Sequence, residues 1–143
     1  MKNFISIIAL MFTSAWMNAQ TESADVDLAQ HKIVFQLTSA DTNVHKMLVR
    51  QLGNVLAAAP NSMVEVVCHG PGIAMLTAKQ TVVHPKVSEL KGKGINFVVC
   101  ENTLKEKKVA KEEIIPEAGF VKAGIIEIVK KQEEGWSYIR AGQ

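Results

Sequence analysis

The chain has 143 residues, of which 48% are hydrophobic and 21% are charged, a composition that suits one globular domain and leaves no room for two. Sixteen Lys and Arg residues against fourteen Asp and Glu residues give a net charge of +2. This near balance disfavours a nucleic-acid-binding role, which usually needs a strongly basic face.

Residues 1–19 have the order of a secretory signal peptide. Lys2 gives a basic start, residues 4–12 are almost wholly apolar, and small residues such as Ala15 and Ala19 follow. The apolar stretch is shorter than the ~20 residues that a bilayer span needs, which makes a membrane anchor the less favoured reading. We expect cleavage after Ala19, or earlier after Ala15, and export to the periplasm or the extracellular space with no membrane contact afterwards.

Residues 20–30 are polar and acidic without an apolar period, so we expect a flexible lead-in before a single domain over 31–143. The run 32–37 is short, apolar and β-branched, as in a strand. Apolar residues then recur at helical spacing and predict an amphipathic helix over 44–56, capped by Asp41 or Thr42.

The later elements alternate between the two types. In chain order we expect a strand at 64–68, a glycine turn at 69–72, short helices at 73–78 and 87–93, a strand at 95–99, a short helix opening at 102–103, an edge strand at 120–121, a helix around 125–129 and a last strand at 136–139.

The predicted inner strands are apolar on successive residues, which indicates burial on both faces, as in parallel sheets. The alternation of strands and helices predicts an α/β fold, a mostly parallel sheet with helices on both faces. No internal repeat, low-complexity tract or linker suggests a second domain.

In such a sheet, ligands bind beyond the carboxyl ends of the strands. This rule selects the residues that follow each strand: Thr38, Ser39 and Asp41; Cys68 and His69; and Cys100, Glu101 and Asn102. A thiol, an imidazole and helix N-termini are therefore expected along one edge.

Cys100 is the main candidate for chemistry. It lies just before a predicted helix, whose free amides and dipole favour a thiolate, whereas the charge of Glu101 opposes it. The alternative is that Cys100 fills the core as a small hydrophobic residue. The chemical hypothesis requires a sulfur that solvent can reach.

Cys68 is a second thiol of weaker promise, because it continues an apolar run and can simply fill the core. If the strands that end at Cys68 and Cys100 are neighbours, the two sulfurs could be near enough for a disulfide. The sequence leaves the bridge open.

His69 could tune the thiolate or donate a proton, and the turn with Gly70 and Gly72 could offer backbone amides to an anion, although such turns are common in loops without function. Asn102 and Thr103 would complete the binding edge. The other histidines have no metal-ligand spacing, so we expect no metal, and no dinucleotide, phosphate-loop or serine-hydrolase motif implies a cofactor.

Three phrases carry a resemblance to a known family: HGPGI at 69–73, FVVCENTLK at 97–105 and GWSYIR at 135–140. On these phrases the region from Lys32 to Arg140 resembles the DsrE/DsrF-like proteins, and the cysteine phrase is the most specific. The resemblance implies a three-layer α/β/α domain with a five-stranded, mostly parallel sheet that assembles into oligomers. Several relatives carry sulfur as a persulfide on a cysteine, and Cys100 is the matching residue.

Two hypotheses follow. The first is an exported sulfur-handling or thiol-redox protein, sulfurtransferase-like if it is an enzyme, in which Cys100 is the nucleophile or persulfide carrier and a protein or small thiol is the sulfur donor or acceptor. The second is a non-catalytic module for a small ligand or for oligomeric assembly, suggested by the apolar residues around Phe120. Export departs from the cytoplasmic relatives, and an oxidising compartment threatens a free thiol.

Overall fold

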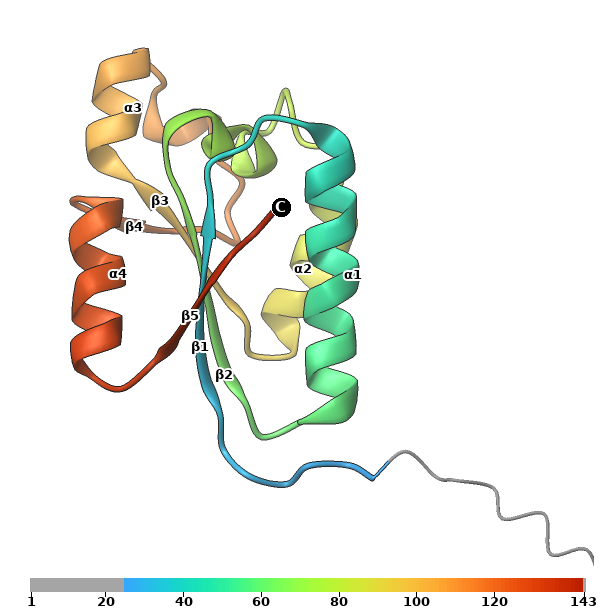
Figure 1. The fold of residues 1–143 in the computed structure, drawn as a ribbon. Helices are drawn as coiled ribbons and strands as arrows, with labels where there is room; N and C mark the ends of the chain where they lie inside the picture. The colour runs from blue at the N-terminus through green and yellow to red at the C-terminus, as the bar shows by residue number, and fades with distance from the viewer. Residues whose placement is uncertain (1–24, 143) are drawn as a thin grey trace, which may run out of the picture.

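The computed structural model describes residues 25–142 (Figure 1). The expected signal peptide at 1–19 and the first part of the expected lead-in lie outside the described residues. Within the described part, no helix is both long and apolar enough to cross a membrane.

Five parallel strands form one sheet in the order β4-β3-β2-β1-β5. This confirms the predicted α/β fold and five strands, and every neighbouring pair is parallel. The strands are β1 (Lys32–Leu37), β2 (Met63–Cys68), β3 (Asn96–Cys100), β4 (Gly119–Val121) and β5 (Ser137–Arg140).

The helices fall close to their predicted places, with one difference. The expected glycine turn and the helix after it form a single 3₁₀ helix, because Pro71 begins a tight turn in which the Gly72 amide donates to the His69 carbonyl at 3.0 Å. The helices are α1 (Thr42–Ala58), η1 (Gly70–Leu76), α2 (His84–Gly92), α3 (Glu101–Lys107), η2 (Lys111–Glu113) and α4 (Gly124–Glu133). Asp41 is the N-cap of α1, accepting from the Asn43 amide at 2.8 Å.

The sheet is covered differently on its two faces. Helices α1 and α2 lie on one face, and α4 lies on the other with α3 beyond the strand ends (Figure 1). Leu48 and Leu52 of α1 pack with Phe97 and Val99 of β3 in the larger core. A smaller core under α4 comprises Val34, Val67, Val98 and Ile128. Alternate side chains of an inner strand therefore pack into the two cores on opposite faces of the sheet.

The topology places the start of α4 at the carboxyl edge of the sheet. From β1 to β4 the chain moves outward strand by strand, and α4 then carries it back across the sheet to β5 beside β1. Because β4 and β5 are both parallel to β1, α4 begins where β4 ends. Its first residue, Gly124, thus lies at the edge where β3 delivers Cys100.

Part of the expected lead-in is held against the domain. The Asp27 amide donates to the Ala58 carbonyl at 2.8 Å, and the Asn61 side chain donates to the Leu28 carbonyl at 2.8 Å. His31 also pairs with Asp27 at 2.7 Å. The contacts of Asp27 and Leu28 hold this part of the expected lead-in against the end of α1 and the residues that follow it.

Candidate functional site

Cys100 is the last residue of β3 and the N-cap of α3. Because Val98 faces α4, the strand alternation also turns Cys100 toward α4. There the Gly124 amide donates a hydrogen bond to the Cys100 Sγ at 3.2 Å. Cys100 is buried, with only 5% of the residue exposed, which contradicts the expectation of a readily solvent-reachable sulfur.

Several donors act on this sulfur. Burial raises the pKa of the Cys100 thiol, but hydrogen bonds from the Thr103 hydroxyl and from the amides of Gly124, Thr103 and Asn102 outweigh it and lower the pKa below its ordinary value. The bond from Gly124 is the well-formed one, since the sulfur makes no standard capping bond to the first turn of α3. The arrangement favours a thiolate, and the Thr103 hydroxyl and the Gly124 amide contribute most to it.

Thr103 connects the thiol to the turn after β2. Its side chain is 5% exposed, and its Oγ1 accepts from the Gly70 amide at 3.0 Å. With that acceptor position taken, the hydroxyl proton is free to be donated toward Cys100. Thr103, predicted as a binding residue, is here a donor to the thiol.

The glycine turn is structural. Gly70 has a φ of +52°, which glycine adopts at little cost, and its amide is used by Thr103. The Gly72 amide is used by the His69 carbonyl, and a Cβ at Gly72 would lie 2.1 Å from the Leu37 carbonyl oxygen. The sequence suggested that these two amides could serve an anion, but both already have partners: Thr103 of α3 for Gly70 and the His69 carbonyl for Gly72.

His69 is half-buried beside the same site. The His69 Nε2 lies 2.8 Å from the Gln36 Nε2. A Cβ added at Gly124 would lie 3.1 Å from the Cβ of His69. Burial lowers the pKa of His69, so the ring is neutral at neutral pH. A neutral imidazole can donate a hydrogen bond, but it is a poor acid, which leaves His69 suited to tuning the thiolate rather than protonating it.

The first residues of α3 hold the α4 loop. The Asn102 amide donates to the Lys122 carbonyl at 3.3 Å, while its exposed side chain points away from the core. Glu101, which was expected to oppose a thiolate, forms an ion pair with Lys111 that partly offsets its charge. Asn102 thus acts through its backbone, by fixing the loop that carries Gly124.

The two cysteines do not form a disulfide, and both are free. Strands β2 and β3 are neighbours, and Cys68 is paired in register with Val99. Cys68 and Val99 both belong to the larger core under α1 and α2, whereas Cys100 faces α4. Cys68 is fully buried, and burial raises the pKa of its thiol, so it is a core residue rather than a second reactive group.

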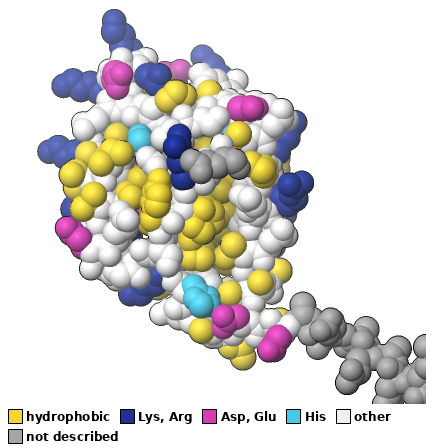
Figure 2. Space-filling view, viewed as in Figure 1, with side chains coloured by type: hydrophobic (Ala, Val, Ile, Leu, Met, Phe, Trp, Pro, Cys, Tyr) yellow, Lys and Arg dark blue, Asp and Glu magenta, His cyan; other side chains and the backbone are white. Residues whose placement is uncertain are grey.

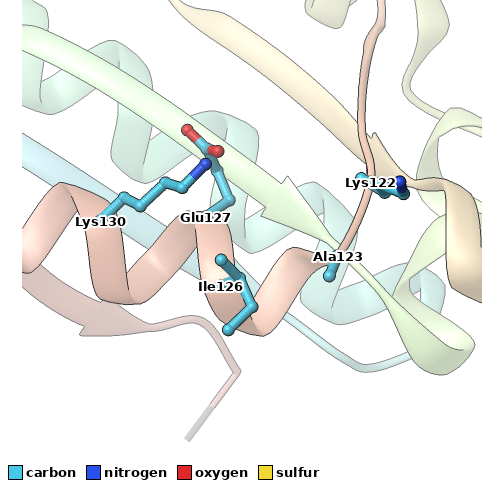
Figure 3. A pocket seen from close by; sticks show the side chains of 5 residues that line it. All are labelled: Lys122, Ala123, Ile126, Glu127 and Lys130. Atoms are coloured by element: carbon cyan, nitrogen blue, oxygen red, sulfur yellow. The ribbon is translucent and has the colours of Figure 1, made fainter.

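A cavity of about 230 Å³ opens beside the start of α4 (Figure 3). It is lined by Lys122, Ala123, Ile126, Glu127 and Lys130, so its walls combine an apolar floor with charged side chains. Cys100 does not line it, but the cavity adjoins the Ala123–Gly124 segment that contacts the sulfur. Within 25–142, no group of three or more His, Cys, Asp or Glu residues is arranged to hold a metal ion.

Three residues of this edge were missed from the sequence: Gly124, Gln36 and Tyr138. The Tyr138 hydroxyl donates to the side-chain oxygen of Gln36, the residue whose side-chain nitrogen contacts His69. Tyr138 stands in the phrase GWSYIR, which was a usable signal. Gly124 and Gln36 carry no signal in one sequence, since only the fold brings them to the site.

Comparisons with known proteins agree with this architecture. The family model described as the DsrE/DsrF-like family matches residues 31–141. A solved structure of the protein of unknown function MTH1491 from Methanobacterium thermoautotrophicum is 30% identical, with a TM-score of 0.73, and the alignment covers 77% of this chain and 98% of that one. No curated protein matches the sequence. Because the family model spans most of the chain, the protein belongs to the DsrE/DsrF-like family.

Proposed function

We propose that this chain is an exported sulfur-handling protein in which Cys100 carries sulfane sulfur as a persulfide. Family membership supports a role related to sulfur relay. The observation that carries the assignment to Cys100 is the hydrogen bond from the Gly124 amide at the start of α4 to its Sγ at 3.2 Å. Donors of this kind favour a thiolate, which is the nucleophilic form of cysteine.

The proposed reaction is a sulfur exchange that needs no oxidant. The Cys100 thiolate attacks the outer sulfur of a persulfide R–S–S⁻, the sulfur–sulfur bond of the donor breaks, and the products are Cys100–S–S⁻ and R–S⁻. Atoms and charge balance across the step. The small exposure of Cys100 favours a small thiol persulfide as donor.

Sulfur loading can be tested by intact-protein mass spectrometry. The full chain is incubated with glutathione persulfide, and a gain of one sulfur atom on Cys100 is expected. Cys100→Ser should lose the gain, whereas Cys68→Ala should keep it because Cys68 is buried in the core. Loading that survives in Cys100→Ser, or no loading of the wild type, would refute the proposal.

Export is tested by the same measurement on protein taken from its native compartment. A mature mass that begins after Ala19 or after Ala15 supports removal of a signal peptide. A mass that includes Lys2 contradicts it. The spectrum also shows directly whether the thiols are free or carry added sulfur.

A second candidate function is an assembly module, and one observation favours it. Ile125, Ile126 and Val129 of α4 are 55%, 51% and 40% exposed, and Phe120 on β4 is 39% exposed. Figure 2 shows hydrophobic side chains gathered at the surface over α4 and along the middle of the same view, where β5 lies. The three α4 residues lie within five positions of one helix, and exposed apolar side chains grouped in this way mark contact surfaces. Phe120 is paired with Val99 and so faces the other side of the sheet.

We propose that α4 forms contacts between copies of the chain. Ile125→Lys should reduce the mass measured by size-exclusion chromatography with light scattering, and Cys100→Ser should leave it unchanged. If Cys100→Ser abolishes sulfur loading and keeps the assembly, the two roles are separate. A monomeric wild type refutes the assembly role.

A further inference from the structure

One carboxamide joins the edge strand β5 to the imidazole of His69. Gln36 lies on β1, between Tyr138 on β5 and His69, which directly follows β2. The Tyr138 hydroxyl donates to the Gln36 Oε1, and the Gln36 Nε2 lies 2.8 Å from the His69 Nε2. The three side chains form a continuous chain of hydrogen bonds across two neighbouring strand pairs.

The two ends of a carboxamide are chemically different, which gives this chain a direction. The oxygen of Gln36 only accepts and its nitrogen only donates. Since the oxygen is taken by the Tyr138 hydroxyl, the nitrogen faces the His69 Nε2 as a donor. That ring nitrogen must then be an acceptor, and in a neutral imidazole the proton resides on Nδ1.

The ring stands next to the thiol site. A Cβ at Gly124 would lie 3.1 Å from the His69 Cβ and 3.3 Å from its Cγ, while the Gly124 amide contacts the Cys100 sulfur at 3.2 Å. One glycine therefore separates the imidazole from the thiol. Nε2 is committed to Gln36, so Nδ1, which is bonded to Cγ, is the nitrogen left for chemistry at this edge.

We infer that Tyr138 and Gln36 are positioning residues that hold His69 as the neutral Nδ1–H tautomer, so that it presents a hydrogen-bond donor to the sulfur site at Cys100. The inference rests on the proposed function. As the donor's sulfur–sulfur bond breaks, negative charge develops on the departing R–S⁻, and the Nδ1–H group donates a hydrogen bond to it. The proton stays on nitrogen, in the electrophilic manner open to a neutral imidazole.

The tautomer is read directly by NMR on the ¹⁵N-labelled full chain without any sulfur donor. Long-range ¹H–¹⁵N spectra distinguish a protonated ring nitrogen from an unprotonated one, and the His69 signals are assigned by their loss in His69→Asn. We expect a protonated Nδ1 and an unprotonated Nε2. An Nε2–H tautomer in the wild type would overturn the inference.

Two variants test the direction of the chain. Gln36→Glu keeps the shape but leaves only acceptor atoms, so it should move the proton to Nε2 and favour the imidazolium. Tyr138→Phe removes only the hydroxyl that orients Gln36, so the population of the Nδ1–H form should fall. Unchanged His69 ¹⁵N shifts in both variants would refute a positioning role, because a purely structural contact alters the melting temperature and leaves the tautomer as it was.

Sulfur loading supplies the functional readout. Loss of one neutral hydrogen bond in the transfer step should slow loading of Tyr138→Phe by roughly two- to tenfold. The tautomer is measured in resting protein, so it is independent of loading. If His69 carries its proton on Nδ1 but Cys100 takes up no sulfur, the proposed function is refuted and the positioning of His69 is supported. If Cys100 takes up sulfur normally but His69 carries its proton on Nε2, the positioning of His69 is refuted and the proposed function is supported.

Discussion

Replacing Thr103 by valine removes one hydroxyl from the site while keeping the side-chain shape. The hydroxyl accepts from the Gly70 amide at 3.0 Å and lowers the pKa of the Cys100 thiol as a donor. Thr103 is 5% exposed, so solvent does not replace either bond. The substitution should therefore affect both the stability of the fold and the reactivity of the sulfur.

The magnitudes follow from the two lost bonds. An amide left without an acceptor costs about 1–3 kcal/mol, and the half-buried turn at Gly70 suggests about 1 kcal/mol of unfolding free energy. A hydrogen bond to a charged group is worth about 1.5 kcal/mol at the low end, which corresponds to a roughly tenfold smaller thiolate fraction below the pKa. The more basic thiolate is also more nucleophilic, with a Brønsted coefficient of about 0.4–0.5, so its rate constant for attack is roughly threefold higher.

The assay is thiol–disulfide exchange with hydroxyethyl disulfide, followed by mass over a range of pH. Below both pKa values, Thr103→Val should react roughly threefold more slowly than wild type, and above both it should react roughly threefold faster. Thr103→Ser keeps the hydroxyl, so its pH–rate profile should match the wild type. The lost methyl group should lower the unfolding free energy by about 0.8 kcal/mol. Profiles of Val and Ser variants that coincide would refute the role of the hydroxyl.

Three further outcomes are expected. Gly72→Ala should lower the unfolding free energy measured in urea by about 3 kcal/mol, because its Cβ would lie 2.1 Å from a backbone oxygen. The control Gly53→Ala has open space around its Cβ within α1 and should raise the unfolding free energy by about 0.5–1 kcal/mol. Equal effects of the two substitutions would contradict the steric reasoning. Gly124→Ala presses on the neighbouring imidazole and displaces the amide donor, so exchange at Cys100 should slow at low pH, and an unchanged profile would show that this donor is dispensable. Burial raises the pKa of Glu65 in the folded protein above its unfolded value near 4.5. The folded protein is therefore most stable, with respect to this group, below that unfolded value, where Glu65 is protonated in both states. This contribution to the unfolding free energy is lost as the pH rises through the folded pKa. The unfolding free energy of Glu65→Gln relative to wild type should therefore shift in favour of glutamine as the pH rises from about 4 to about 8, and a flat difference would exclude a raised pKa.

The sequence predicts the architecture well because hydrophobic periodicity and strand–helix alternation are local properties. They place Cys100 at the end of a buried parallel strand, and the helix after it is where the spacing predicts. The role of the glycine turn, in contrast, depends on a contact that is distant in sequence. A turn rich in glycine and proline indicates tight backbone geometry, but whether the Gly70 amide is free depends on Thr103, which lies 33 residues later on α3.

The amides at the start of α3 were predicted as donors to the thiol, but the donor from α4 could not be, since it depends on a long-range contact. Gly124 lies 24 residues after Cys100, and it reaches the sulfur only because α4 must start at the carboxyl edge to return to β5. Tyr138 and Gln36 are 102 residues apart and meet through the β1–β5 pairing. Nothing in the composition or spacing of the chain specifies that pairing.

The register of two neighbouring strands also decides whether a free thiol can persist in the proposed exported state. Disulfides form and persist in oxidising compartments, so a second cysteine within reach would remove the nucleophile. Cys68 pairs with Val99, one residue before Cys100, and side chains alternate along a strand, so the sulfurs lie on opposite faces of the sheet. A shift of one residue in this register would place both sulfurs on one face of adjacent strands. The fold therefore keeps the Cys100 thiol apart from the Cys68 thiol, on the opposite face of the sheet.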